Sequence, residues 1–106
     1  MRVLEIRTYE LLAGAGAAFH RLVVEESVPM LRRWGVEVSA FGPSLDDADS
    51  YYLIRGYPSL EELKRSQDAF YGSDEWRHGP REAIVSLIGS SHSVVLPDDA
   101  LSRTVR

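Results

Sequence analysis

The order of strand and helix patterns along the chain limits its fold more than any other feature. Residues 3–11 alternate in character as a strand does, and the next stretch repeats apolar residues at helical spacing. Two strand-like segments, 36–41 and 51–57, are joined by a polar turn and predict an antiparallel hairpin. A second helical region and a last strand over 90–96 follow. The predicted order is therefore strand, helix, strand, strand, helix, strand.

Proline, glycine and serine set the expected limits of the helices. Pro29 lies inside the first helical stretch and lacks the N–H for the bond four residues back, so we expect a kink or break near Val28. Gly35 is expected to end that helix. Ser59 and Glu62 have the spacing of a capping box, which predicts a helix start there.

This order is the ferredoxin-like βαββαβ pattern, and it predicts an α+β protein. Its antiparallel sheet carries helices on one face and leaves the other face open. We expect one domain over residues 1–97 and a C-terminal tail over 98–106. An open face would expose a mixed patch on a monomer, so we expect two copies to pair through it as a homodimer.

The first strand has two unlike faces. Successive strand side chains point to opposite sides of a sheet. Residues 4, 6 and 8 (Leu, Ile and Thr) share one face, which we expect to pack on the helices. Glu5, Arg7 and Tyr9 share the other face, which we expect to be enclosed between the two paired sheets.

Composition excludes several classes of function. The net charge of −4 argues against a phosphate-backbone binder, so no nucleic-acid partner is expected. The chain has no cysteine, which excludes disulfides and cysteine-ligated metals. No apolar run is long enough for a membrane span, and none at the start resembles a signal peptide. We therefore expect a cytoplasmic protein with no membrane partner.

Four motifs follow one another along the chain, namely Glu5-Ile6-Arg7-Thr8-Tyr9-Glu10-Leu11, Tyr57-Pro58-Ser59-Leu60-Glu61-Glu62, Tyr71-Gly72-Ser73-Asp74-Glu75-Trp76-Arg77 and Val94-Val95-Leu96-Pro97. Together they span about residues 3–97, and they resemble motifs of the NIPSNAP family. One departure is Ala13-Gly14, where the family usually has Pro-Gly after the first strand.

The resemblance implies a dimeric α+β barrel in which two ferredoxin-like sheets enclose a shared interior. Many members of that wider superfamily carry out cofactor-free chemistry on small, often aromatic metabolites, as monooxygenases, isomerases, cyclases or decarboxylases. Most NIPSNAP members themselves have no assigned reaction. We accordingly expect no cofactor.

Glu5, Arg7 and Arg55 are the candidate ligand-binding residues. An arginine guanidinium offers a forked set of donors to an anionic oxygen of a ligand. Tyr9 beside them could stack on a ring or donate a proton. The alternative is that Glu5 and Arg7 only pair with each other, because an interior charge needs a partner.

His20 and His92 are the candidate catalytic acid–base residues, together with Tyr9. Histidine titrates near neutral pH, and a general base has to reach its proton directly or through one water. His78 ranks below these two on that test. Each histidine can also be a surface or capping residue.

No metal site is predicted. No two histidines stand four residues apart, and Asp46, Asp47 and Asp49 lack the glycine and distal glutamate of a calcium loop. The sequence thus predicts a dimer whose interior binds a small, partly aromatic or apolar metabolite, with cofactor-free isomerase, cyclase or monooxygenase chemistry. The alternative is a non-enzymatic dimeric module for ligand sensing or protein interaction, with a solvent-filled or packed interior.

Overall fold

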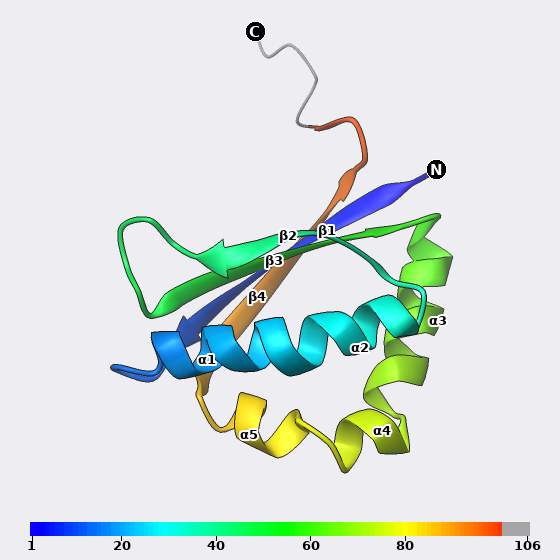
Figure 1. The fold of residues 1–106 in the computed structure, drawn as a ribbon. Helices are drawn as coiled ribbons and strands as arrows, with labels where there is room; N and C mark the ends of the chain where they lie inside the picture. Colours follow the sequence, from blue (N-terminus) through cyan, green and yellow to red (C-terminus); the bar gives the residue numbers. More distant parts are fainter. Residues whose placement is uncertain (101–106) are drawn as a thin grey trace, which may run out of the picture.

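The structure is a computed structural model, and it describes residues 1–100 of the chain. Within these residues, four strands and the helical segments alternate largely as the sequence predicts (Figure 1). The elements are β1 (Val3–Leu11), α1 (Gly16–Leu22), the π-helical segment η1 (Val23–Ser27), α2 (Val28–Arg33), β2 (Glu37–Pro43), β3 (Ser50–Tyr57), α3 (Leu60–Tyr71), α4 (Asp74–Arg77), α5 (Arg81–Val85) and β4 (Ile88–Pro97).

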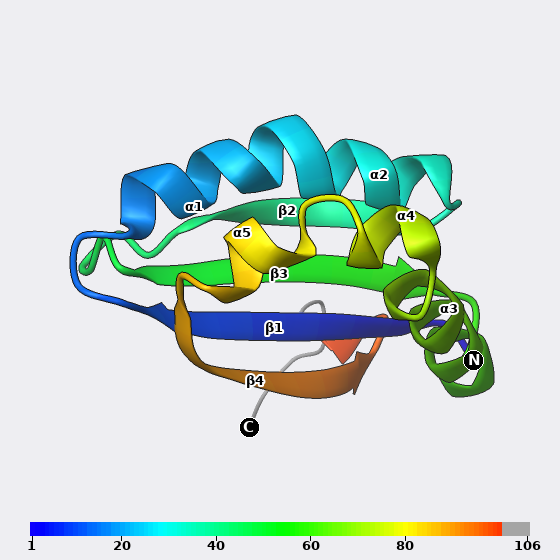
Figure 2. The same ribbon diagram turned by 90° about the horizontal axis from the view of Figure 1, so that it is seen from below.

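The strands form one antiparallel sheet in the order β2-β3-β1-β4, and the helices lie on one face of it. This arrangement confirms the predicted α+β, ferredoxin-like fold. Figure 2 shows α1 and α2 running along β2, with α4 and α5 in front of the centre of the sheet. Strand β4 forms the far edge, and residues 89–95 are exposed along it. The helical layer therefore covers β2, β3 and β1 better than β4.

The irregularity predicted near Val28 is a π-helical segment, and the helix does not break. The Val28 N–H bonds to the carbonyl of Val23, five residues back, which closes the wider π turn directly before α2. Pro29 then stands in the first turn of α2, directly after this wider turn. Ser27, at the end of the π segment, is buried.

The helices cover the face of β1 that was predicted to be open, so that prediction was wrong. Tyr9 packs against Phe19 of α1, with ring centroids 5.2 Å apart, and Glu5 is 2% exposed. The opposite face carries Leu4, Ile6 and Thr8, of which Thr8 is exposed. The polar face can be buried because Glu5 finds a charged partner on β3 and the tyrosine rings supply apolar area.

The open face of the sheet therefore carries different residues from those that the sequence predicts. Strand pairing aligns Ile6 with Ile54 of β3 and with Val94 of β4, and Thr8 with His92. Val94 is 57% exposed. We use "open face" below for Leu4, Ile6, Thr8, Tyr52, Ile54, His92, Val94 and Leu96.

Side-chain caps position the second helical region. The Ser59 hydroxyl accepts the N–H of Glu62 at 3.1 Å, which confirms the predicted start of α3, while the Glu62 carboxylate binds Arg65. The Ser73 hydroxyl accepts the N–H of Trp76 at 3.2 Å and starts α4 in the same way. The Ser73 cap lies at the turn between Tyr71 and Trp76, which both line the space over the sheet.

The chain leaves β4 beside the beginning of β1. The Asp98 N–H bonds to the Arg2 carbonyl at 3.1 Å, and the Asp98 carboxylate lies 3.2 Å from Arg2 Nε. Of the predicted tail 98–106, residues 101–106 lie outside the described residues. None of the helices in residues 1–100 has the length and apolar character that crossing a membrane requires.

Candidate functional site

A buried ion pair joins the two central strands beneath the helices. Arg55 Nε and Nη2 both donate to Glu5 Oε1, at 2.9 and 2.5 Å. Glu5 and Arg55 are directly opposite each other in the β1–β3 register. Two of the candidate ligand-binding residues, Glu5 and Arg55, are therefore neighbours, and the partner that an interior charge requires is present.

Arg7 binds the second oxygen of the same carboxylate. Its Nη2 donates to Glu5 Oε2 at 3.2 Å, and the Arg7 side chain is 25% exposed. Arg55 is fully buried and uses its remaining Nη1 to donate to the Tyr71 hydroxyl at 2.7 Å. The structure thus brings the three predicted ligand-binding residues together, with Tyr71 as a fourth member.

The electrostatics of this group favour its charged form. Burial alone would raise the pKa of Glu5, but Arg55, the Gln67 amide and Arg7 outweigh it and hold that pKa below its usual value. Burial tends to lower the pKa of Arg55, and its neighbours Tyr71 and Glu5 raise it instead. Glu5 and Arg55 are therefore both ionised at neutral pH.

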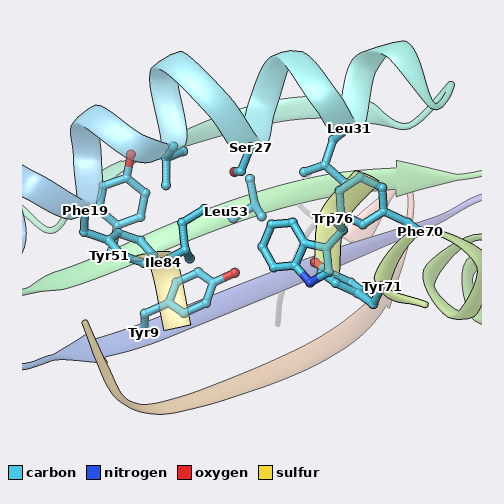
Figure 3. Close-up of a pocket in the computed structure, with 11 residues that line it drawn as sticks. Tyr9, Phe19, Ser27, Leu31, Tyr51, Leu53, Phe70, Tyr71, Trp76 and Ile84 are labelled. Atoms are coloured by element: carbon cyan, nitrogen blue, oxygen red, sulfur yellow. The ribbon is translucent and has the colours of Figure 1, made fainter. Parts of the chain in front are cut away.

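The space between the sheet and the helices is closely packed. A cavity of about 30 Å³ remains there, lined by residues of β1, β3 and every helical segment. Figure 3 shows Tyr9 projecting from β1, Ser27 and Leu31 reaching in from the helix opposite, and Trp76 and Tyr71 closing one end. A cavity of this size holds one water molecule and is too small for a metabolite.

A larger pocket of about 530 Å³ opens on the other side of Tyr9, Tyr71, Trp76 and Ile84. These four side chains line both spaces and therefore separate them. The pocket lies between strands β1 and β4 and the segment from α3 to α5. Its further lining residues are Arg7, Gln67, Arg81, Val85, Ile88 and Ser91.

Tyr9 is the one predicted catalytic residue that lines this pocket. Burial raises the pKa of its hydroxyl to about 12. Tyr9 is therefore protonated at neutral pH and can donate a hydrogen bond or a proton, but it is a poor base.

The two predicted catalytic histidines lie elsewhere. His20 Nδ1 is 2.6 Å from the Tyr51 hydroxyl, and the two groups share a hydrogen bond at the beginning of the helical layer. His92 pairs with Thr8 on the open face, on the other side of the sheet from Tyr9. The structure therefore brings neither histidine to the pocket.

Several pocket residues were absent from the sequence-based candidates. Tyr71 and Trp76 belong to a motif that resembles NIPSNAP sequences, and this motif was the one signal that could have identified them. Arg81 gives no such signal, because a single arginine at a helix start is common on protein surfaces. Within residues 1–100, no group of three or more acidic, histidine or cysteine side chains could hold a metal ion.

Solved structures share this fold. A NIPSNAP family protein from Agrobacterium tumefaciens superposes with a TM-score of 0.81 and 20% identity, covering 93% of this chain and 88% of that one. A NIPSNAP-like domain protein from Burkholderia xenovorans superposes with a TM-score of 0.84 and 18% identity, covering 99% of this chain and 91% of that one. SnoaB, a cofactor-independent oxygenase from Streptomyces nogalater, superposes with a TM-score of 0.66 and 16% identity, covering 91% of each chain.

Comparison at the level of sequence gives no counterpart. No protein-family model matches the chain, and no curated protein matches it either. Sequence identities near 20% over whole chains establish the fold and carry no residue roles with them. The chain thus has the fold of NIPSNAP family proteins, as the resemblance of its motifs predicts.

Proposed function

We propose that this protein binds a small, partly aromatic or apolar metabolite in the pocket between β1, β4 and α3–α5, and acts on it without a cofactor. The pocket volume of about 530 Å³ is the observation that carries this proposal. It falls within the range of about 300–1,000 Å³ that small-molecule sites occupy. Its lining combines apolar walls with a few polar groups, as such sites do.

The two kinds of lining residue suggest how a ligand is held. Trp76, Ile84, Val85 and Ile88 offer flat or branched apolar surface to a ring. Tyr9 and Tyr71 present hydroxyl groups, and Arg55 fixes the Tyr71 hydroxyl through the 2.7 Å hydrogen bond. A protonated Tyr9 would serve as the proton donor in an isomerase-, cyclase- or monooxygenase-type reaction. The likeness in fold to a cofactor-independent oxygenase supports chemistry of this kind.

The second candidate is a non-enzymatic dimeric module for ligand sensing or protein interaction. Two observations favour it: the interior cavity is only about 30 Å³, and both candidate histidines lie away from the pocket. Binding and turnover measurements together separate the candidates, because a sensing module binds a ligand without converting it, and an interaction module with a packed interior has no pocket ligand.

The proposed assembly is a homodimer through the open face. Ile6, Ile54 and Val94 are adjacent in the strand register and form an apolar centre on this face. Burying such a centre removes apolar area from water, at about 25 cal/mol per Å². A second copy supplies a face of the same chemistry, as the dimeric barrel implied by the resemblance does. The cytoplasm is the compartment that we propose for it.

A matched pair of valines tests the dimer. Val94 on the open face is 57% exposed, and Val24 on the helical layer is 45% exposed. Val94→Lys should convert a dimer into a monomer in sedimentation at micromolar concentration, whereas Val24→Lys should leave the dimer intact. A monomeric unmodified protein would contradict the proposed assembly.

Pocket binding is tested with a neutral bicyclic probe, 2-naphthalenemethanol, in equilibrium dialysis. Val85 lines the pocket and is 42% exposed, so Val85→Trp should fill the entrance and raise the dissociation constant about tenfold or more. Val24→Trp is the control, because Val24 lines none of the pockets described above. Absence of probe binding at millimolar concentration would contradict pocket binding and favour a protein-interaction module.

A further inference from the structure

The pocket has a positive charge that the protein as a whole does not have. The chain carries a net charge of −4. Among the described residues that line the pocket there are two arginines, Arg7 and Arg81, and no carboxylate. A local excess of one sign against the overall charge attracts ligands of the opposite sign.

The buried ion pair leaves the charge of Arg7 largely available to the pocket. Glu5 contributes one negative charge, and Arg55 and Arg7 contribute two positive charges, so this group retains one positive charge. Arg55 makes the shorter contacts to Glu5, at 2.5 and 2.9 Å, against 3.2 Å for Arg7. Within residues 1–100, the Arg7 side chain makes one hydrogen bond, which leaves most of the guanidinium donors free.

Arg81 adds a second positive charge from the helical side. It is the first residue of α5 and is exposed. Within the part of the chain that the structure describes, its side chain makes no hydrogen bond or ion pair, unlike Arg33 and Arg65 on the same surface layer. Its guanidinium is therefore free to bind a ligand at the pocket.

We propose that the pocket selects organic anions, namely small molecules with a carboxylate on a flat apolar body. This inference rests on the proposed function and specifies the class of ligand. The carboxylate binds between Arg7 of β1 and Arg81 of α5, because paired guanidinium groups offer it several charge-assisted hydrogen bonds. The apolar body lies against Trp76, Ile84 and Ile88, which belong to the apolar part of the lining.

Two probes of nearly equal shape separate this inference from the proposed function. Equilibrium dialysis with 2-naphthoate and with neutral 2-naphthalenemethanol measures the preference for charge directly. We expect the unmodified protein to bind 2-naphthoate about tenfold or more tightly, because each guanidinium contact is charge-assisted. The preference should fall as NaCl is raised from low to high concentration.

Arginine variants identify the residues responsible. Arg7→Gln and Arg81→Gln should each reduce the preference for 2-naphthoate, and the double variant should abolish it while binding of the neutral probe is retained. Arg77→Gln is the matched control, because Arg77 is an exposed arginine of α4 that does not line the pocket. Circular dichroism confirms that each variant is folded.

Each outcome decides between the two proposals. Equal binding of both probes by the unmodified protein overturns the anion inference and leaves the proposed function standing. A preference that survives in the double variant also overturns it. Failure of both probes to bind overturns the proposed function, and this inference with it.

Discussion

Arg55 on β3 and Glu5 on β1 face each other, and Arg55 Nε and Nη2 both donate to Glu5 Oε1, at 2.9 and 2.5 Å. Both side chains are almost wholly excluded from solvent, at 0% and 2% exposure. The register of the two central strands therefore sets the geometry of the pair. The same pair orients Arg7 and Tyr71, which line the pocket.

Removing one member of this pair should strongly destabilise the protein. Glu5→Gln leaves the Arg55 guanidinium buried without a counter-charge, which costs about 3–5 kcal/mol. The total stability of a domain of this size is about 5–15 kcal/mol. Urea unfolding at neutral pH, followed by circular dichroism, measures the loss.

Two controls accompany that measurement. The double variant Glu5→Leu with Arg55→Met removes both charges and should recover much of the lost stability, because an apolar pair needs no counter-charge. Arg33→Gln breaks the exposed pair with Glu75 and should have a much smaller effect. A Glu5→Gln protein as stable as the unmodified one would show that the pair contributes nothing net.

Stability should fall in acid because of the same carboxylate. The pKa of Glu5 is lowered in the folded protein, so its stabilisation is fully present above the pKa of the unfolded chain, about 4.3. It is lost as the pH falls through the lower folded pKa. Between about pH 5 and pH 3, the unmodified protein should lose more unfolding free energy than Glu5→Gln does. Parallel pH curves for the two proteins would contradict this assignment.

The fold could be predicted from the sequence because its signals are local. Alternation over β1, the cap at Ser59 and the glycine after α3 each act within a few residues. Pro29 correctly marked an irregularity, but the choice of a π turn over a break depends on packing that buries Ser27. Local signals alone do not contain that information.

The site was harder to predict because both faces of β1 could have been buried. Leu4, Ile6 and Thr8 look like the core face by hydrophobicity, yet Glu5, Arg7 and Tyr9 lie beneath the helices. Arg55, opposite Glu5 on β3 and fifty positions later, supplies the fully buried counter-charge that permits this burial. A contact at that sequence separation leaves no local pattern.

A loop carboxylate holds the first helix to the sheet. Asp49 accepts the N–H of Gly14 and the N–H of Gly16, both at 2.9 Å, and so caps α1 from the β2–β3 connection. Asp49→Ala should cost about 1–2 kcal/mol, since two N–H groups at a helix start lose their acceptor. Asp46→Ala in the same loop, where the carboxylate accepts only the Ser44 hydroxyl among described contacts, should change stability little. Urea unfolding compares the two, and equal losses would remove Asp49 from this capping role.

The same junction gives the last prediction, at Gly16. A Cβ atom on Gly16 would lie 1.9 Å from the carbonyl oxygen of Ala48, which is backbone and cannot rotate away. Gly16→Ala should therefore push the β2–β3 loop off α1 and cost about 3 kcal/mol in urea unfolding. Gly14→Ala is the matched control: it has a φ of +81° but open space around it, so its cost should be about 1 kcal/mol of backbone strain.

The Asp49→Ala background shows whether the cost at Gly16 comes from this contact. Once the carboxylate no longer ties the loop to the Gly16 N–H, the loop can move away from an added Cβ more easily. Gly16→Ala should then cost less than it does in the unmodified protein, by about 0.5–3 kcal/mol of coupling. The cost of Gly14→Ala should change less, because its strain lies in its own backbone. Strict additivity of Asp49→Ala and Gly16→Ala would mean that the loop and the helix do not share this constraint.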